Sequence, residues 1–195
     1  MKHNYWKRLS SGKYVDLGDL QPDDVSIEDV NTSLNNIYRF TGHHKDRKPL
    51  TVAQHSLLCY QLAEIIEPDD FRLHLAVLTH DFAECIIGDV ATPVKKAMGQ
   101  SWRDFAMPIE RIFEEKFFGE KVDVELHDRV KLYDLMALDI ERRIMWESQY
   151  GKDKWPMTPL SFGKLSDKKE IFDRVSSCDI DLDLTWGYAY RAAWA

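Results

Sequence analysis

The chain has 195 residues, of which 44% are hydrophobic and 30% are charged, and this suffices for one domain with a hydrophobic core. Its net charge of −7 argues against a general nucleic-acid-binding protein, which is normally basic, so no stable nucleic-acid complex is expected. The apolar runs are too short to cross a bilayer and the polar N-terminus lacks a secretory signal, so we expect a cytoplasmic protein without a membrane partner.

The first part of the chain contains a predicted hairpin and a predicted helix. Residues 4–18 are expected to be irregular or hairpin-like, because the run Ser10–Lys13 is rich in turn-forming residues. Ser26 and Asp29 resemble a capping box, and the apolar residues that follow at helical spacing predict a helix over 27–39. Because no internal repeat or linker is found, the whole chain is expected to form a single domain.

Three helix signals follow in the middle of the chain. Thr51 and Gln54 form a second capping box, which predicts a helix over 52–66. The next helix is predicted over 70–84, because it contains an apolar run made of Leu73, Leu75, Ala76, Val77 and Leu78. The Thr92-Pro93 pair predicts the start of another helix, with the threonine as its cap and the proline at its first position.

The second half of the chain also reads as helical. Ser101 is expected to cap a helix that Pro108 kinks or breaks, and the aromatic stripe 102–117 is expected to be core or a subunit interface. Asp123 is expected to cap a long helix over about 124–148. Two shorter helices are predicted, from Asp167 to about 176 and over 181–193. Because strand signals are weak after the N-terminus, the predicted class is all-α.

Two histidines and two aspartates form a candidate metal site, namely His55, His80, Asp81 and Asp134. They fall on three predicted helices, on or beside an apolar face, so each should point inward. A divalent cation is an efficient partner for buried imidazole and carboxylate groups, and a mixed nitrogen and oxygen shell suits Zn²⁺, Co²⁺ or Mn²⁺. A cysteine-free shell with room for water is typical of a catalytic site. Asp81 could also bridge to a second, harder ion such as Mg²⁺.

The cysteines are not expected to take part in this site. Cys59, Cys85 and Cys178 are odd in number, widely spaced and without a CxxC pattern. Such a distribution is typical of reduced and mostly buried thiols in a cytoplasmic protein.

The order His…His-Asp…Asp on successive helices resembles the signature of the HD-domain metal-dependent phosphohydrolases. The likeness extends to the pattern HD-x-x-E…G-D…T-P-x-K of the 5′-deoxynucleotidase branch, which small phage enzymes that hydrolyse dATP also carry. The matching segments are Arg39-Phe40, Val52–Ser56, His80–Glu84, Gly88-Asp89 and Thr92–Lys95. The resemblance covers roughly residues 25–146 of the single domain 1–195. It implies an HD-domain helical bundle in which the four residues above hold the catalytic ion.

The same resemblance implies roles for five further residues. Glu84 is expected to orient or deprotonate the attacking water, and Asp89 to position water or protonate the leaving oxygen. Arg39 and Lys95 are expected to neutralise the phosphate charge that grows in the transition state. Phe40 stands where the 5′-deoxynucleotidase branch has a tryptophan, and its ring is expected to lie near the sugar or the base.

Several of the candidate site residues also have a simpler structural interpretation. Asp139 competes with Asp134, which is favoured because it lies beside the apolar stripe and follows Lys131 at a spacing of one helical turn. Glu84 could be a solvated carboxylate on the last turn of its helix. Arg39 and Lys95 could be surface charges. The pair His43-His44 is left out of the metal set, because a polar loop that sees substrate or solvent explains it.

The leading functional hypothesis is a metal-dependent hydrolase of 2′-deoxynucleoside phosphates. A dNTP triphosphohydrolase that prefers dATP is favoured, because the compact size and the short spacing from Asp81 to Asp134 resemble the small phage enzymes. The alternative within this class is a 5′-deoxynucleotidase that removes phosphate from dNMPs. An acidic chain can bind such substrates, since a metal ion and a few local cations hold the phosphates.

Two other classes compete with this hypothesis. A non-catalytic nucleotide sensor would be expected to have lost catalytic groups, whereas every group of the pattern remains here. A cyclic-nucleotide phosphodiesterase would carry more metal histidines or a longer signature, and neither is found. The resemblance further implies a homo-oligomer, either a dimer or a hexamer, and for a phage-like enzyme a place in the host cytoplasm.

Overall fold

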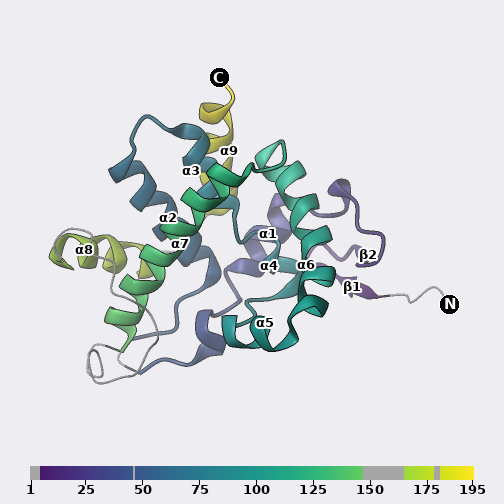
Figure 1. The fold of residues 1–195 in the computed structure, drawn as a ribbon, viewed down its shortest axis with the longest axis horizontal. Coiled ribbons are helices and arrows are strands. Elements are labelled where there is room, and N and C mark those ends of the chain that lie inside the picture. Colours follow the sequence, from purple (N-terminus) through teal and green to yellow (C-terminus); the bar gives the residue numbers. More distant parts are fainter. Residues whose placement is uncertain (1–4, 46, 147–164, 178–180) are drawn as a thin grey trace.

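The computed structural model of the protein describes residues 5–45, 47–146, 165–177 and 181–195, with the backbone alone for residues 165–170. Most of these residues are helical and a short two-stranded hairpin precedes the helices, so the predicted all-α class is confirmed (Figure 1). Within these ranges, no helix is both long enough and apolar enough to cross a membrane.

The N-terminal hairpin is tied to the first helix through one carboxylate. Strand β1 (Trp6–Arg8) pairs antiparallel with β2 (Tyr14–Asp16), as predicted. Asp29 accepts hydrogen bonds from Ser10 Oγ at 2.8 Å and from the backbone N–H of Ser11 at 2.7 Å, both in the turn between the strands. The same carboxylate forms the predicted capping box with Ser26 at the start of α1 (Ile27–Leu34).

The first helix is shorter than predicted. It ends at Leu34 instead of residue 39, and Arg39–Gly42 form the separate 3₁₀ segment η2. Asn35 accounts for the early end, because its side chain donates a hydrogen bond to the backbone oxygen of Asn31 at 2.9 Å and so competes with the helical pattern. The chain then runs extended through Tyr38, which forms an isolated bridge to the residue before the next helix.

The helix that carries the first histidine begins and ends as predicted. Helix α2 spans Val52–Ile66, and the capping box is present, with Thr51 Oγ1 accepting from the Gln54 N–H at 3.2 Å. Helix α3 (Phe71–Thr79) ends before the predicted residue 84, and a short α4 (Glu84–Ile87) follows. The predicted single helix is interrupted because residues 80–83 form tight turns, with the N–H of Phe82 bonded to the Thr79 oxygen at 3.0 Å.

Helices α5 (Thr92–Met98) and α6 (Gln100–Phe113) lie beyond this turn. The predicted threonine and serine caps are wrong, because the capping positions are Ala91 and Gly99 and neither provides a side-chain cap. Of the predicted kink or break at Pro108, the break is wrong. Helix α6 continues through the proline and passes into the π-helical segment η3 (Glu114–Phe118).

The long helix and the two C-terminal helices complete the described chain. Helix α7 spans Val124–Met145 with Asp123 as its cap, as predicted, although it ends at Met145 before the predicted residue 148. Helix α8 (Leu165–Ser176) begins before Asp167, so this residue is not the cap. Helix α9 spans Leu182–Ala193, close to the prediction. Residues 147 and 148 and Cys178 lie outside the described residues.

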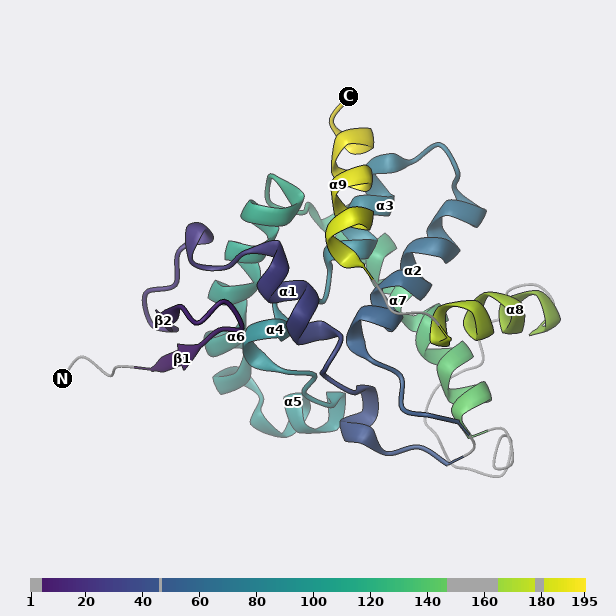
Figure 2. The same cartoon turned by 180° about the vertical axis from the view of Figure 1, so that it is seen from behind.

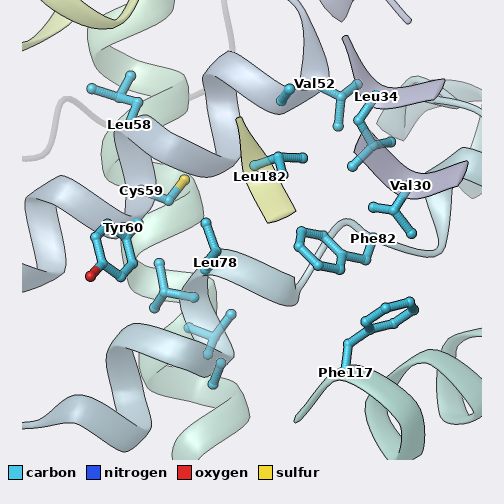
Figure 3. Close-up of a cluster of buried hydrophobic side chains, with 14 of the residues drawn as sticks. Val30, Leu34, Val52, Leu58, Cys59, Tyr60, Leu78, Phe82, Phe117 and Leu182 are labelled. Atoms are coloured by element: carbon cyan, nitrogen blue, oxygen red, sulfur yellow. The ribbon is translucent and has the colours of Figure 1, made fainter. Parts of the chain in front are cut away.

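The core lies where α2, α3, α7 and α9 pack together, and Figure 2 shows α9 beside α3 on the face opposite α7. Phe82, Phe117 and Leu182 are fully or almost fully buried in it (Figure 3). Part of the aromatic stripe is therefore core, as one of its two interpretations predicted. Two indole donors hold helix α9 in place. Trp186 Nε1 donates to the backbone oxygen of Phe117 at 2.8 Å, and Trp194 Nε1 donates to the backbone oxygen of Phe118 at 3.1 Å.

The Asp29 carboxylate generates a prediction about acid stability. Burial acts to raise its pKa, but the hydrogen bonds from Ser11, Ser10 and Ser26 lower it from 3.8 to about 2. A carboxylate whose pKa is depressed by folding stabilises the fold fully above its unfolded pKa, and this stabilisation is lost as the pH falls through the folded value. We expect Asp29→Asn to lower the free energy of unfolding by roughly 2 kcal/mol at neutral pH and by about 1 kcal/mol near pH 3.

Urea unfolding at the two pH values measures this difference. The exposed Asp19 is the matched control, because an Asp→Asn change at a surface position away from such a network should stay within about 0.5 kcal/mol. An Asp29→Asn effect that is the same at both pH values would contradict the assigned role.

Candidate metal centre

The two histidines of the site are held by their Nδ1 atoms. His55 lies in the first turn of α2 and is completely buried, and its Nδ1 is 2.6 Å from Oε1 of Glu141 on α7. His80 follows the last residue of α3, and its Nδ1 is 2.7 Å from the backbone oxygen of Val77. Because Nδ1 of each ring makes such a contact, Nε2 of each ring faces the space between the two histidines, as in metal-binding histidines.

The two predicted aspartates lie in front of these Nε2 atoms. Asp81 Oδ2 is 3.5 Å from Nε2 of His55 and 3.3 Å from Nε2 of His80, while Asp134 Oδ1 is 3.4 Å from Nε2 of His55. Two nitrogen or oxygen atoms that bind one tetrahedral ion at about 2.0–2.1 Å stand about 3.4 Å apart. The separations therefore match those expected around a single cation.

One buried nitrogen of these four side chains lacks a hydrogen-bond partner. Within the described part of the chain, His80 Nε2 makes no hydrogen bond, although it is buried. A buried polar atom without a partner is costly, and a cation in front of the ring would remove the cost. The four side chains predicted as ligands are thus brought together by the fold, and the donor set fits a divalent ion. That they bind one stays a prediction.

The electrostatics of the two aspartates agree with this arrangement. Burial alone would raise the pKa of Asp81, but the neighbouring imidazoles of His80 and His55 lower it below its usual range. Burial also acts to raise the pKa of Asp134, but the neighbouring imidazoles of His55 and His80 lower it. Both side chains are therefore carboxylates at neutral pH, the form that binds a cation.

Asp139, the competitor of Asp134, lies outside this cluster. Its carboxylate pairs with Arg142 at 3.3 Å and with Arg143 at 2.8 Å, on the same helix. The choice of Asp134 on the basis of the apolar stripe therefore agrees with the geometry. Asp134 also pairs with Lys131, the neighbour that favoured it in the sequence.

The sequence reasoning missed Glu141. This residue is completely buried, lies about two helical turns after Asp134 on α7 and contacts His55 and Arg39 at once. Its distance to Arg39 is 3.5 Å, from Oε2 to the guanidinium NH2 group. The signal in the sequence was a carboxylate on the same face of a long helix as the predicted ligand Asp134.

Arg39 joins the cluster from the side of η2. Its side chain is almost fully buried, with NH1 3.6 Å from Asp89 Oδ1 and 3.9 Å from Asp81 Oδ2. Burial would lower the pKa of this guanidinium, but Glu141 and Asp89 raise it, so the charge is permanent. The alternative that Arg39 is a surface charge is wrong.

Glu84 is also buried, so its interpretation as a solvated carboxylate is wrong. Burial and the charges of Asp81 and Asp89 raise its pKa above the usual range. Its Oε2 makes no hydrogen bond to any described residue, while Lys95 Nζ lies 3.6 Å from Oε1. Lys95 is partly exposed, and its ammonium group lies 5.5 Å from the centre of the Trp102 ring.

Phe40 lies at the edge of the site. Its ring makes an edge-on contact with Trp146 at 4.9 Å between centroids, and the guanidinium of Arg39 lies 5.7 Å from the ring centre. The backbone of Phe40 is left-handed, with φ of 55°, which is uncommon for a bulky residue and costs free energy. His43 and His44 are exposed, in keeping with their omission from the metal set.

Cys59 is the second residue that the sequence reasoning missed. It is fully buried, about one helical turn after His55, and its Sγ lies 3.5 Å from Nε2 of that histidine. The signal in the sequence is the i, i+4 spacing of the two residues on α2, which also fits the predicted core thiol. Cys59 and Cys85 are indeed free and buried.

Comparison with known proteins gives relatives but no described function. No family model matches the chain. The uncharacterized protein RCAP_rcc00048 of Rhodobacter capsulatus is 39% identical over 98 residues, which cover 50% of each chain, so the match spans half the length of that relative. The uncharacterized protein YfdR of Escherichia coli K12 is 33% identical over 133 residues, which cover 68% of each chain.

The contact between Glu141 and His55 generates a prediction. We expect Glu141→Gln to weaken binding of Co²⁺ or Zn²⁺ by about 10- to 100-fold, because outer partners of a metal-binding histidine orient the ring and raise its basicity. Isothermal titration of the folded variant measures the dissociation constant.

Asp139→Asn is the matched control, since Asp139 is also a buried carboxylate of α7 but pairs only with arginines of its own helix in the described structure. Equal loss of affinity in both variants would show that Glu141 acts through general stability and would contradict its role in orienting His55.

Proposed function

The chain belongs to the same family as YfdR of Escherichia coli, and we propose that it is a metal-dependent hydrolase of 2′-deoxynucleoside phosphates with an HD-domain fold. One observation carries the proposal: the Nε2 atoms of His55 and His80 face the carboxylates of Asp81 and Asp134 at 3.3–3.5 Å. The order of these ligands along the chain is similar to that of the HD-domain phosphohydrolases, which supports the same conclusion.

His55, His80, Asp81 and Asp134 hold the ion in this proposal. A bound Zn²⁺, Co²⁺ or Mn²⁺ supplies Lewis-acid chemistry, polarising a phosphoryl oxygen and lowering the pKa of a bound water. The protein contributes fixed ligands in a buried cluster, so that little reorganisation is needed during the reaction.

Glu84 acts as the group that orients the attacking water and takes its proton. Its Oε2 is buried and makes no hydrogen bond in the described structure, so it is free to accept one from water. Lys95 Nζ lies 3.6 Å from the other carboxylate oxygen, Oε1, and its positive charge balances the negative charge of Glu84. A general base needs this kind of access within hydrogen-bond reach of the nucleophile.

The phosphates are neutralised by cations on two sides of the cluster. Arg39 reaches the site from η2 and lies within 4 Å of Asp81 and Asp89, where a phosphoryl group next to the ion can approach it. Lys95 lies on α5, is partly exposed and can follow a phosphate chain that extends toward solvent. Asp89, whose pKa is raised by burial, is suited to protonating the leaving oxygen.

The preferred reaction is hydrolysis of a dNTP, with dATP first, to deoxynucleoside and triphosphate. The alternative reaction releases phosphate from a dNMP. Both use the same ion and carboxylates and differ in the phosphate chain that must be accommodated. The homo-oligomer and the cytoplasmic location stay predictions.

A substrate screen tests the proposal. Purified protein with Co²⁺ or Mn²⁺ is incubated with each dNTP, each dNMP and the matching ribonucleotides, and the products are separated by chromatography. We expect deoxyadenosine and triphosphate from dATP, and no turnover by Asp81→Ala, which lacks a ligand near both histidines. Orthophosphate from dNMPs would select the alternative reaction, whereas metal binding without any turnover would favour a nucleotide sensor.

The role of Glu84 generates a separate prediction. We expect Glu84→Gln to lower kcat by about 10²- to 10⁴-fold, the usual contribution of a general base, while the bound metal is retained. Steady-state kinetics and elemental analysis measure the two quantities. Glu125→Gln is the control, because Glu125 is exposed at the start of α7. A Glu84 variant that keeps its kcat would contradict the assigned role.

A further inference from the structure

The thiol of Cys59 belongs to the same cluster as the histidine nitrogens. Cys59 Sγ, a ring nitrogen of His55 and a ring nitrogen of His80 all lie within 4.8 Å of one another. Figure 3 shows the sulfur among the buried side chains of the core, directed away from the ring of Tyr60. The thiol is therefore inside the protein, next to the proposed ligands.

The distance from the sulfur to Nε2 of His55 fits a sulfur that shares an ion with this ring. A nitrogen at about 2.05 Å and a sulfur at about 2.3 Å from one tetrahedral ion stand about 3.6 Å apart. Cys59 Sγ lies 3.5 Å from Nε2 of His55 and 4.0 Å from Nδ1 of the same ring, so the sulfur has to move toward the front of Nε2 to share the ion. The largest distance among the three ligand atoms of His55, Cys59 and His80 is at most 4.8 Å. It has to shorten by about 1 Å for all three atoms to bind the same ion.

Three side-chain atoms gather around His55 Nε2. Cys59 Sγ, Asp81 Oδ2 and Asp134 Oδ1 surround this nitrogen at 3.4–3.5 Å. The thiol is within hydrogen-bond distance of this nitrogen, whereas the two oxygens lie beyond the usual N–H···O range of about 2.7–3.2 Å. A cation at the centre would satisfy all of these groups at once.

We propose that Cys59 binds the ion of the proposed metal centre as a thiolate, together with His55 and His80, and directs the site toward Zn²⁺ or Co²⁺ and away from Mn²⁺ and Mg²⁺. The proposal rests on the metal centre of the proposed function. On binding, the S–H bond breaks, the sulfur keeps the electron pair and donates it to the ion, and the proton leaves to the buffer. Thiolate is a soft donor that Mn²⁺ and Mg²⁺ bind poorly.

Cobalt is the probe for this sulfur, because a thiolate bound to Co²⁺ gives a sulfur-to-cobalt charge-transfer absorption in the near ultraviolet. The protein without added metal is titrated with Co²⁺, and the spectrum is recorded for the wild type, Cys59→Ser and Cys85→Ser. We expect the absorption in the wild type and in Cys85→Ser, and its loss in Cys59→Ser. Cys85 is the matched control, as a second buried free thiol.

Affinity gives an independent readout. We expect Cys59→Ser to weaken Zn²⁺ binding by more than about 10-fold, since even outer partners of a ligand contribute that much, and to change Mn²⁺ binding far less. An unchanged ratio of Zn²⁺ to Mn²⁺ affinity would overturn the proposal.

The spectrum of the wild type with Co²⁺ tests the proposal even if Cys59→Ser fails to fold. Co²⁺ that binds without the charge-transfer absorption, and that is lost in Asp81→Ala, overturns the role of Cys59 and leaves the proposed metal centre intact. A wild type that binds neither Co²⁺ nor Zn²⁺ overturns the metal centre itself, and with it the proposed function.

Discussion

The concentration of buried and half-buried carboxyl groups around His55 and Arg39 is the constraint on which the rest of the structure depends. Arg39 is the buried cation at its centre, and Lys95 and Lys131 approach only from the edges. The carboxylates of the cluster are Asp81, Glu84, Asp89, Asp134 and Glu141. Burying a charge without a partner is costly, so these side chains require positive charge that the described residues supply only in part.

Glu141 is the carboxylate that contacts both a proposed ligand and the buried guanidinium of Arg39. Its two oxygens face two different partners, since Oε1 lies 2.6 Å from His55 Nδ1 and Oε2 lies 3.5 Å from the Arg39 guanidinium. One side chain of α7 therefore sets the orientation of an imidazole on α2 and holds the cation of η2. Because all three partners are buried, movement of any one of these elements would leave an unpaired charge in the interior.

The features that the sequence predicted well are local. The caps at Ser26, Thr51 and Asp123 depend on side chains that bond the backbone a few residues away, and each is present. The early end of α3 depends on the turns at residues 80–83, for which an apolar run gives no signal. The order of chemically distinctive residues indicated the four candidate ligands. Glu141 was missed because its significance arises only when α2 and α7 pack together, and Cys59 was missed because its spacing from His55 on α2 also fits an ordinary core thiol.

The position of the C-terminal helix affects the order in which the chain can fold as it is made. Leu182 is completely buried, and its backbone N–H bonds the side chain of Asn31 on α1 at 3.1 Å. The indoles of Trp186 and Trp194 bond the last carbonyls of the π-helical segment. Until residues 182–194 leave the ribosome, these polar groups and the apolar faces of α1 and α3 lack their partners. The earliest helices must therefore wait for α9, and the native core can close only after residues 182–194 have been synthesised.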